Sequence, residues 1–282
     1  MKKSLILILA AALTLSLAAC GSSQDAATSG DTAQEEGKTE LVVFAAASLT
    51  ETLTQLGEEY MAEHPDVSLV FNFDSSGTLK TQIQEGADVD LFLSAGQKQM
   101  DQLDITADPS VNTEGLDFVL EGTRLDILEN KVALAVPEGN PAGIQSYEDL
   151  ADGLQAGTVL LAMGNADVPV GQYTQKIFAY FGLDEQALAE AGCITYGSNV
   201  KEVTTQVTEG AVDCGIIYQT DAFSDHLTVV DTATAEMCGQ VVYPAAVMKV
   251  SKNPQAAKDF LSYLTSEAGD KVFAEVGFTP IG

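Results

Sequence analysis

Short apolar runs and segments of helical periodicity follow one another along most of the chain. Runs that suit strands lie at 41–45, 67–73, 90–94, 131–137, 158–163, 194–197, 214–218 and 241–250. Helical patterns lie at 49–63, 77–86, from 147 onward, and at 172–182, 199–209 and 254–277. In the first of these, Leu49, Leu53, Leu56 and Tyr60 share one face. Strands that alternate with helices predict an α/β protein with mostly parallel sheets flanked by helices.

Four of the junctions between a strand and the next helix consist largely of small, hydroxylated or apolar residues. The first runs from the apolar residues 41–47 into Ser48, and Ser48 with Glu51 has the spacing of a capping box. Comparable junctions lie at 75–77, 168–171 and 197–200. Helix N-termini attract anions through free N–H groups and the helix dipole. One interpretation is that Ser48 only caps its helix. The recurrence favours another, in which the four helix starts converge on one anion.

The first 38 residues have the pattern of a lipoprotein leader and a tether. Lys2 and Lys3 precede an apolar core at 5–17, and small residues then lead to Cys20. We expect 1–19 to be a signal peptide and Cys20 to be lipidated; an ordinary cleaved signal or an uncleaved anchor are the alternatives. Residues 20–38 have almost no apolar side chains to bury and predict a flexible tether. The expected location is the extracytoplasmic face of the cell membrane.

Acidic residues dominate the charge of the chain. Aspartate and glutamate number 41 against 13 lysines and arginines, which gives a formal net charge of −28. Such a surface excludes nucleic acid as a partner, because phosphate binding needs basic patches. It does not exclude a small anion. Scattered surface carboxylates are screened beyond about 8 Å at physiological salt, and N–H dipoles in a recessed cleft act at closer range.

No sequence pattern indicates an enzyme or a protein-bound metal ion. The two histidines, His64 and His226, lie in polar surroundings and are expected at the surface. The sequence has no nucleophile elbow and no phosphate-binding loop. Cys193, Cys214 and Cys238 lack the spacing of a zinc site. One disulfide and one free thiol are possible among these three, and the sequence does not select a pair.

Six phrases of the sequence resemble one known family in order and spacing. They are 44–50 (FAAASLT), 75–79 (SSGTL), 90–95 (DLFLSA), 168–171 (VPVG), 215–218 (GIIY) and 243–247 (YPAAV). From about residue 40 to its end, the chain is similar to the periplasmic molybdate-binding proteins of ABC importers, which are type II solute-binding proteins. The resemblance implies two lobes with a ligand cleft between them. Lobe one is then expected at 39–139 plus 242–282, and lobe two at 140–241.

The same resemblance implies a ligand site and partners. Ser48 and Ser76 would bind the anion through hydroxyl and backbone N–H groups, Val170 and Val200 through backbone N–H groups, and Tyr218 through its phenol. Gly77 stands where a third serine is common, so we assign it no side-chain role. The metal of molybdate or tungstate would be bound only as the oxyanion, without a cofactor. The implied partners are the permease subunits of an ABC transporter, and a monomer is expected.

The implied donor set constrains the ligand further. It offers donors and no acceptors, so it suits a fully ionised tetrahedral dianion. Hydrogen phosphate would leave its hydroxyl unpaired, at a cost of about 1–3 kcal/mol. Sulfate passes this filter and would have to be rejected by cleft size. A receptor for sulfate or another tetrahedral oxyanion is therefore the first alternative function. An exported enzyme and a surface interaction protein are further ones.

Overall fold

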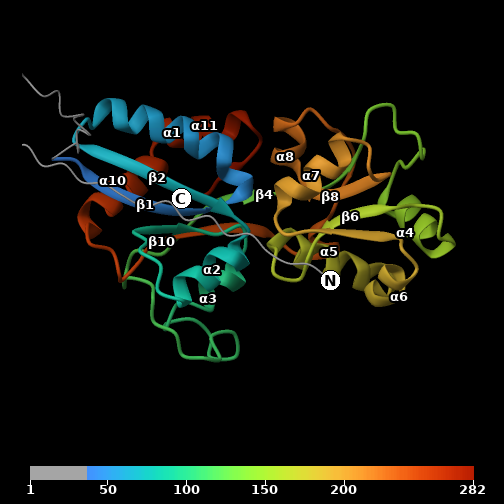
Figure 1. Cartoon of the computed structure of the whole chain (residues 1–282), viewed down its shortest axis with the longest axis horizontal. Coiled ribbons are helices and arrows are strands. Elements are labelled where there is room, and N and C mark those ends of the chain that lie inside the picture. The colour runs from blue at the N-terminus through green and yellow to red at the C-terminus, as the bar shows by residue number, and fades with distance from the viewer. Residues whose placement is uncertain (1–36) are drawn as a thin grey trace, which may run out of the picture. The chain divides into compact units, whose positions relative to one another are not determined.

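Two β-sheets with flanking helices make up the folded chain (Figure 1). The computed structural model describes residues 37–282, so the expected signal peptide, Cys20 and most of the expected tether lie outside the described residues. Residues 37–282 form one compact unit. Within this unit no helix is long and apolar enough to cross a membrane.

The first sheet has six strands, with helices on both faces. Their spatial order is β11 (Thr279–Pro280), β4 (Leu125–Asn130), β10 (Val241–Val247), β3 (Leu91–Leu93), β1 (Thr39–Ala46) and β2 (Val67–Asp74). The helices around this sheet are η1 (Ala47–Leu49), α1 (Thr50–Glu63), α2 (Ser76–Gln84), α3 (Gln97–Asp101), α10 (Pro254–Leu264) and α11 (Glu267–Glu275). Figure 1 shows α1 and α11 above the strands of this sheet and α2 and α3 below them, and α10 contacts both α1 and α11.

The second sheet has five strands. Their order is β7 (Ile194–Gly197), β6 (Leu161–Gly164), β8 (Cys214–Tyr218), β5 (Val132–Val136) and β9 (Thr228–Thr232). The helices between these strands are α4 (Tyr147–Ala156), α5 (Pro169–Phe181), α6 (Glu185–Glu190), α7 (Val200–Thr208) and α8 (Gln219–Ser224). The short helix α9 (Ala235–Cys238) lies on the return path to the first sheet. In Figure 1, α7 and α8 lie above the strands of this sheet and α5 lies below them.

The α/β class is confirmed, and each sheet is mixed in direction. β1, β2 and β3 run parallel in the first sheet, as do β6, β7 and β8 in the second. The strands beside the two chain crossings, β4, β5, β9 and β10, pair antiparallel with their neighbours. The prediction of mostly parallel sheets therefore fits the βαβ segments and does not extend to the crossing strands.

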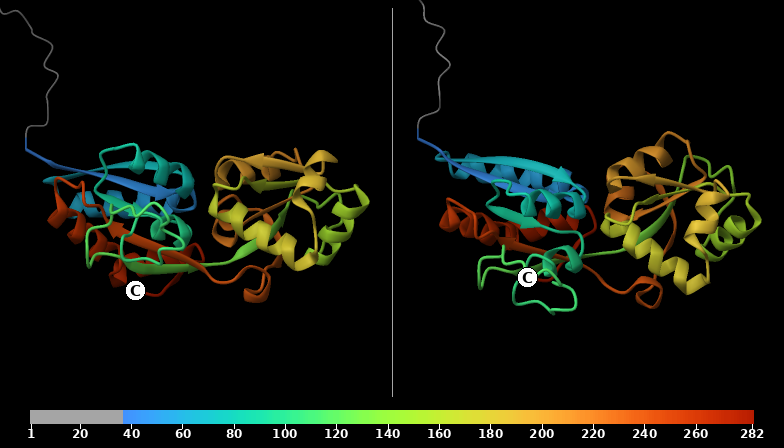
Figure 2. Two further views of the ribbon diagram at one scale, coloured as in Figure 1. Left: turned by 90° about the horizontal axis from the view of Figure 1, so that it is seen from below. Right: turned by 60° about the horizontal axis from the view of Figure 1, so that its bottom comes forward.

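The chain passes from the first sheet to the second at Lys131, between β4 and β5 (Figure 2). It returns between β9 and β10. The expected boundary at 139 placed the strand at 131–137 in lobe one, whereas β5 pairs with β8 and β9 of the second sheet. The Pro-Gly break at 140–143 is a turn within the second half of the fold. The actual crossing has no proline or glycine to mark it.

Strand β1 is buried on both of its faces. Val43 and Ala45 pack into the core on the side of α1 and α10, and Phe44 packs on the opposite side with Leu79 and other residues. The period-2 alternation of a strand sends successive side chains to opposite faces. A strand covered by helices on both faces therefore reads as a continuous apolar run, which explains the pattern at 41–47.

Two predicted helices differ from the observed ones in their bounds. Helix α5 begins at Pro169 rather than at 172, because proline suits the first helical position, where no N–H bond is lost. The helix predicted at 254–277 is divided into α10 and α11. Ser266 caps the second of these, accepting a hydrogen bond from the N–H of Gly269. The pattern of apolar residues continues on both sides of Ser266, so the sequence reads as one helix although a new helix starts there.

A candidate anion-binding site between the two sheets

One small cavity gathers the junctions singled out in the sequence. It is lined by Ala46, Ala47, Ser48, Asp74, Ser75, Ser76, Ala95, Val168, Pro169, Val200 and Tyr218. These residues come from the ends of β1, β2 and β8, from the segment after β3, and from the starts of η1, α2, α5 and α7. The four predicted helix starts therefore do converge. Of the five predicted site residues, Val170 does not line the cavity itself, although the two residues before it do.

Ser48 does not act as a helix cap. It lies within η1, and Leu49 stands at the N-cap of α1 without a side-chain hydrogen bond. The predicted capping box with Glu51 is therefore wrong. The Oγ of Ser48 lies 2.9 Å from the hydroxyl oxygen of Tyr243, and Glu51 pairs with Lys201 instead. A short 3-10 turn between β1 and α1 moves Ser48 away from the N-cap position and into the cavity wall.

Tyr243 is a residue of the site that the sequence analysis left without a role. Its hydroxyl contacts Ser48 and accepts a hydrogen bond from Asn130 Nδ2 at 3.2 Å. The same amide nitrogen donates to Thr220 Oγ1 of α8 at 2.9 Å. Ser48 is thus oriented by a buried polar network that joins both sheets. The phrase at 243–247 pointed to Tyr243, but no local pattern connects a strand tyrosine with a serine 195 residues away.

Ser76 has a free donor on each of its two polar groups. Ser75 is the N-cap of α2 and accepts from the N–H of Thr78, which leaves the N–H of Ser76 at the first helical position. Within residues 37–282 this N–H has no acceptor. The Oγ of Ser76 accepts from the N–H of Ala95 at 2.9 Å. Its own hydroxyl proton therefore remains available to a ligand.

Val200 is the first residue of α7, and Val170 is the second residue of α5. Asn199 caps α7 through the N–H of Glu202, so the N–H of Val200 is left over. Helix α5 has no side-chain cap, and its first residue, Pro169, has no N–H to offer. No acceptor in the described part of the chain is paired with the N–H of Val170 or of Val200. Both valine side chains are buried in the core.

Tyr218 closes the cavity from the end of β8. It is 1% exposed, and its hydroxyl donates to the carbonyl of Ala95, in the other half of the fold, at 3.3 Å. Its ring packs edge-on against Tyr173 and Tyr243. Burial raises the pKa of Tyr218 far above its usual range, and its neighbours, first Tyr243, raise it further. The phenol therefore keeps its proton and is a donor at every physiological pH.

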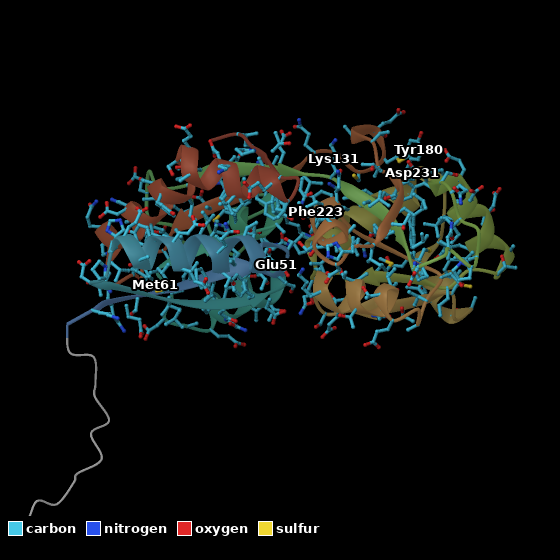
Figure 3. The ribbon with its side chains drawn as sticks, turned by 90° about the horizontal axis from the view of Figure 1, so that it is seen from above. Glu51, Met61, Lys131, Tyr180, Phe223 and Asp231 are labelled. Atoms are coloured by element: carbon cyan, nitrogen blue, oxygen red, sulfur yellow. The ribbon has the colours of Figure 1, made fainter. Side chains whose placement is uncertain are left out.

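Two polar contacts beside the cavity also join the two halves. Asn199 Nδ2 donates to Asp74 Oδ1 at 3.2 Å. Lys201 Nζ lies 2.8 Å from Glu51 Oε1 at the start of α1. Figure 3 labels Glu51, with Phe223 of α8 across the junction. Of the four side chains in these two contacts, only Asp74 lines the cavity.

A buried carboxyl lies behind this second contact. Asp221 of α8 is 1% exposed, and its Oδ1 lies 3.4 Å from Lys201 Nζ. Neither of its oxygens has a hydrogen bond within residues 37–282. Burial raises the pKa of Asp221 to about 7, Lys201 opposes this rise, and Glu51 and Asp225 add to it. The sequence contained no sign that Lys201 and Asp221 would meet.

The polar groups of the cavity are mainly hydrogen-bond donors, and they lie among alanine, valine and proline side chains. The one carboxylate in its lining, Asp74, already accepts from the N–H of Ser75 and from Asn199. Among the described residues no group of three His, Cys, Asp or Glu side chains could hold a metal ion. The three described cysteines are free and buried, and both histidines are exposed, as predicted for the histidines. N–H and O–H donors around a small cavity suit an anion.

Known solute-binding proteins are similar to this chain over most of its length. A sequence family described as bacterial extracellular solute-binding protein matches residues 41–279. The molybdate-binding protein ModA of Mycobacterium tuberculosis is 33% identical over 273 residues, covering 96% of this chain and 95% of that protein. YvgL of Bacillus subtilis, provisionally named an ABC transporter substrate-binding lipoprotein, is 31% identical over 280 residues, 99% of this chain and 98% of its own. The structure of the Azotobacter vinelandii periplasmic molybdate-binding protein matches with a TM-score of 0.71 and 21% identity, covering 86% of this chain and 100% of that one.

Proposed function

Because this chain belongs to the family of bacterial extracellular solute-binding proteins, we propose that it captures molybdate and delivers it to an ABC importer. Its fold is that of the type II periplasmic binding proteins. The relatives called ModA are named as molybdate-binding proteins. The proposed site is Ser48, Ser76, Val170, Val200 and Tyr218, and tungstate is expected to bind there as well.

The observation that carries the proposal is the set of unpaired donors around one cavity. The N–H groups of Ser76, Val170 and Val200 have no acceptors within residues 37–282. A buried N–H without a partner costs about 1–3 kcal/mol, so three of them together favour a bound acceptor. A fully ionised tetrahedral oxyanion has hydrogen-bond acceptors on every side and no hydroxyl group that needs an acceptor. Sulfate shares this property and is the second candidate ligand.

We propose further that the two sheets with their helices act as two lobes. Lobe one comprises 37–130 and 241–282, and lobe two comprises 132–232, with Lys131 and 233–240 as the connections. Donors come from both, since Ser48 and Ser76 belong to lobe one and Val170, Val200 and Tyr218 to lobe two. A ligand that contacts both lobes favours the state in which they are close together.

The proposed cellular setting follows from the leader and the relatives. Lipidation of Cys20 would hold the domain at the extracytoplasmic face of the membrane, with the segment after it as a tether. The name of YvgL as a lipoprotein supports this assignment. The partners are then the anion and the permease subunits, and the protein acts as a monomeric receptor and not as an enzyme. Metabolic labelling with a fatty acid, lost in Cys20→Ala, tests the anchor.

Calorimetric titration tests the ligand. Residues 37–282 are titrated with molybdate, tungstate, sulfate and phosphate. We expect one-to-one binding of molybdate and tungstate, much weaker sulfate binding and no phosphate binding. Equal affinity for sulfate would move the assignment to a sulfate or general oxyanion receptor. A folded sample that binds none of the four would refute the proposal.

Replacing Val170 with alanine separates the role of the backbone from that of the side chain. The N–H remains, so we expect the molybdate affinity to change less than about threefold, equivalent to under 1 kcal/mol. The side chain is fully buried, and its loss lowers the free energy of unfolding by about 2 kcal/mol. Titration and chemical denaturation measure the two effects. An affinity loss of tenfold or more would show that the valine side chain shapes the cavity.

A further inference from the structure

A polar groove lies beside the cavity, between the two halves of the fold. It has a volume of about 450 Å³, and it shares Pro169 with the cavity lining. One of its walls is formed by the start of α3 and the glycine before it, and another by α5. Gly96 of the groove directly follows Ala95 of the cavity. The groove therefore adjoins the cavity and has room for an anion with its water shell.

The charge of this groove is opposite to that of the chain as a whole. Lys98 and Lys176 line it, and no aspartate or glutamate of residues 37–282 does. Asp126 and Glu185 accept hydrogen bonds from two of its side chains but lie outside the lining. The full chain has 41 acidic residues against 13 lysines and arginines. Where carboxylates would be common, the groove has uncharged amides: Gln97, Gln99, Gln172, Gln175 and Gln240.

The positive charge of the two lysines is not neutralised by the protein. Both are exposed, and neither forms an ion pair within the part of the chain that the structure describes. Lys176 Nζ lies 5.0 Å from the centre of the Tyr173 ring and donates to the carbonyl of Cys238 at 3.3 Å. A ring face and a carbonyl hold an ammonium group in place without cancelling its charge. The charge therefore remains available to an anion in the groove.

Acidic groups lie beside other parts of the cavity. Asp74 belongs to the cavity lining itself, and Glu51 forms its ion pair with Lys201, the residue after Val200. A dianion that approaches along these residues meets carboxylates, and the formal net charge of −28 repels it from a distance. A dianion that approaches through the groove meets two unpaired ammonium groups instead.

We propose that the groove is the route by which the dianion enters the cavity, and that Lys98 and Lys176 set its association rate. Positive charge at the mouth of a site raises the rate of encounter, and removing such a charge changes association more than dissociation. Neither lysine lines the cavity, so neither is expected to touch the bound anion. This inference rests on the proposed function, because it concerns entry to that same site.

The test measures both rate constants on residues 37–282 with radiolabelled molybdate. Rapid filtration gives association, and a chase with unlabelled molybdate gives dissociation. We expect Lys98→Gln/Lys176→Gln to lower the association rate constant about tenfold at about 10 mM ionic strength, where charges act over about 30 Å. At about 1 M, where they act over about 3 Å, the difference should fall below about twofold. The dissociation rate constant should change less than about twofold at either ionic strength.

Lys258→Gln/Lys271→Gln is the matched control. These two lysines lie on α10 and α11, are exposed, and line neither the groove nor the cavity. Their replacement removes the same two charges from the chain. An effect of net charge alone would therefore be equal in the two double variants. We expect the control to associate less than about threefold more slowly than the wild type at low salt.

The possible outcomes separate this inference from the proposed function. A wild type that binds no oxyanion refutes the function itself. A wild type that binds molybdate, with equal association rates in the groove variant and the control variant, refutes the role of the groove and leaves the function standing. A groove variant that loses affinity through faster dissociation would also refute it, because the lysines would then hold the bound anion instead of guiding its entry.

Discussion

Replacing Ser48 and Ser76 together with alanine is expected to lower the molybdate affinity by about 10²–10⁴-fold. Each hydroxyl would donate to a charged oxygen, and such a bond contributes about 1.5–3 kcal/mol. Two such bonds account for about 3–6 kcal/mol of binding free energy, which corresponds to an affinity change of about 10²–10⁴-fold. The backbone N–H groups remain and retain part of the site. Titration of the double variant with molybdate measures the loss.

The fold should tolerate both substitutions. In Ser48→Ala the Tyr243 hydroxyl keeps the hydrogen bond from Asn130. In Ser76→Ala the N–H of Ala95 loses its acceptor, which costs about 1–2 kcal/mol of stability. The thermal midpoint should fall by a few degrees and the transition should stay cooperative.

Two other helix-start serines supply the control. Ser146 and Ser266 cap α4 and α11 and do not line the cavity. Their double alanine variant should lose about 1 kcal/mol of stability per cap and keep its molybdate affinity. If Ser48→Ala/Ser76→Ala instead binds as tightly as the wild type, the assigned site is wrong.

Replacing Lys201 with methionine is expected to destabilise the protein by about 3 kcal/mol at pH 8. Lys201 is the only cation paired with Asp221 within residues 37–282. Removing one partner of a buried ion pair leaves an uncompensated charge and costs about 3–5 kcal/mol. The low end applies because a quarter of the Lys201 side chain, 26%, is exposed. Urea denaturation at fixed pH measures the change.

The effect should depend on pH in a definite direction. The pKa of Asp221 is raised from 3.8 to about 7 in the folded protein. Between these values the folded state holds a proton that the unfolded state has lost. The contribution of this carboxyl to stability therefore falls as the pH rises from about 4 to 7, by at most about 1.4 kcal/mol per pH unit. At pH 5 Asp221 is neutral in the folded state, so Lys201→Met should cost less than about 1 kcal/mol there.

Asp221→Asn completes a double-mutant cycle with Lys201→Met. The amide cannot ionise, so Asp221→Asn should flatten the pH dependence between 4 and 7 relative to the wild type. It should also recover most of the stability that Lys201→Met loses at pH 8. A loss from Lys201→Met that is equal at pH 5 and pH 8, and not recovered by Asp221→Asn, would contradict this account of the pair.

Features that lie within one short segment of the chain could be predicted from the sequence. The strand at 214–218 and the helix start at 199–200 are encoded by a few neighbouring residues, and β8 and α7 lie there. The convergence of the four helix starts could also be predicted, because junctions of small residues recur in the sequence at the ends of successive strands. Ser48, Ser76, Val200 and Tyr218 line the cavity as a result.

Features that depend on a contact between distant parts of the chain could not be predicted from the sequence. Ser48 and Glu51 have the spacing of a capping box, but Tyr243 and Lys201 are their partners, and both are distant in sequence. The crossing at Lys131 joins β4 and β5 with one residue and without a turn signal.

The measurement that tests the central claim most directly is a crystal structure of residues 37–282 grown with molybdate, with diffraction data collected at the molybdenum absorption edge. The account predicts one strong anomalous peak in the cavity, surrounded by Ser48, Ser76, Val170, Val200 and Tyr218. The oxygens of the anion should lie about 2.7–3.2 Å from the N–H and O–H donors. A peak outside the cavity, or no peak in crystals grown at saturating molybdate, would contradict the account.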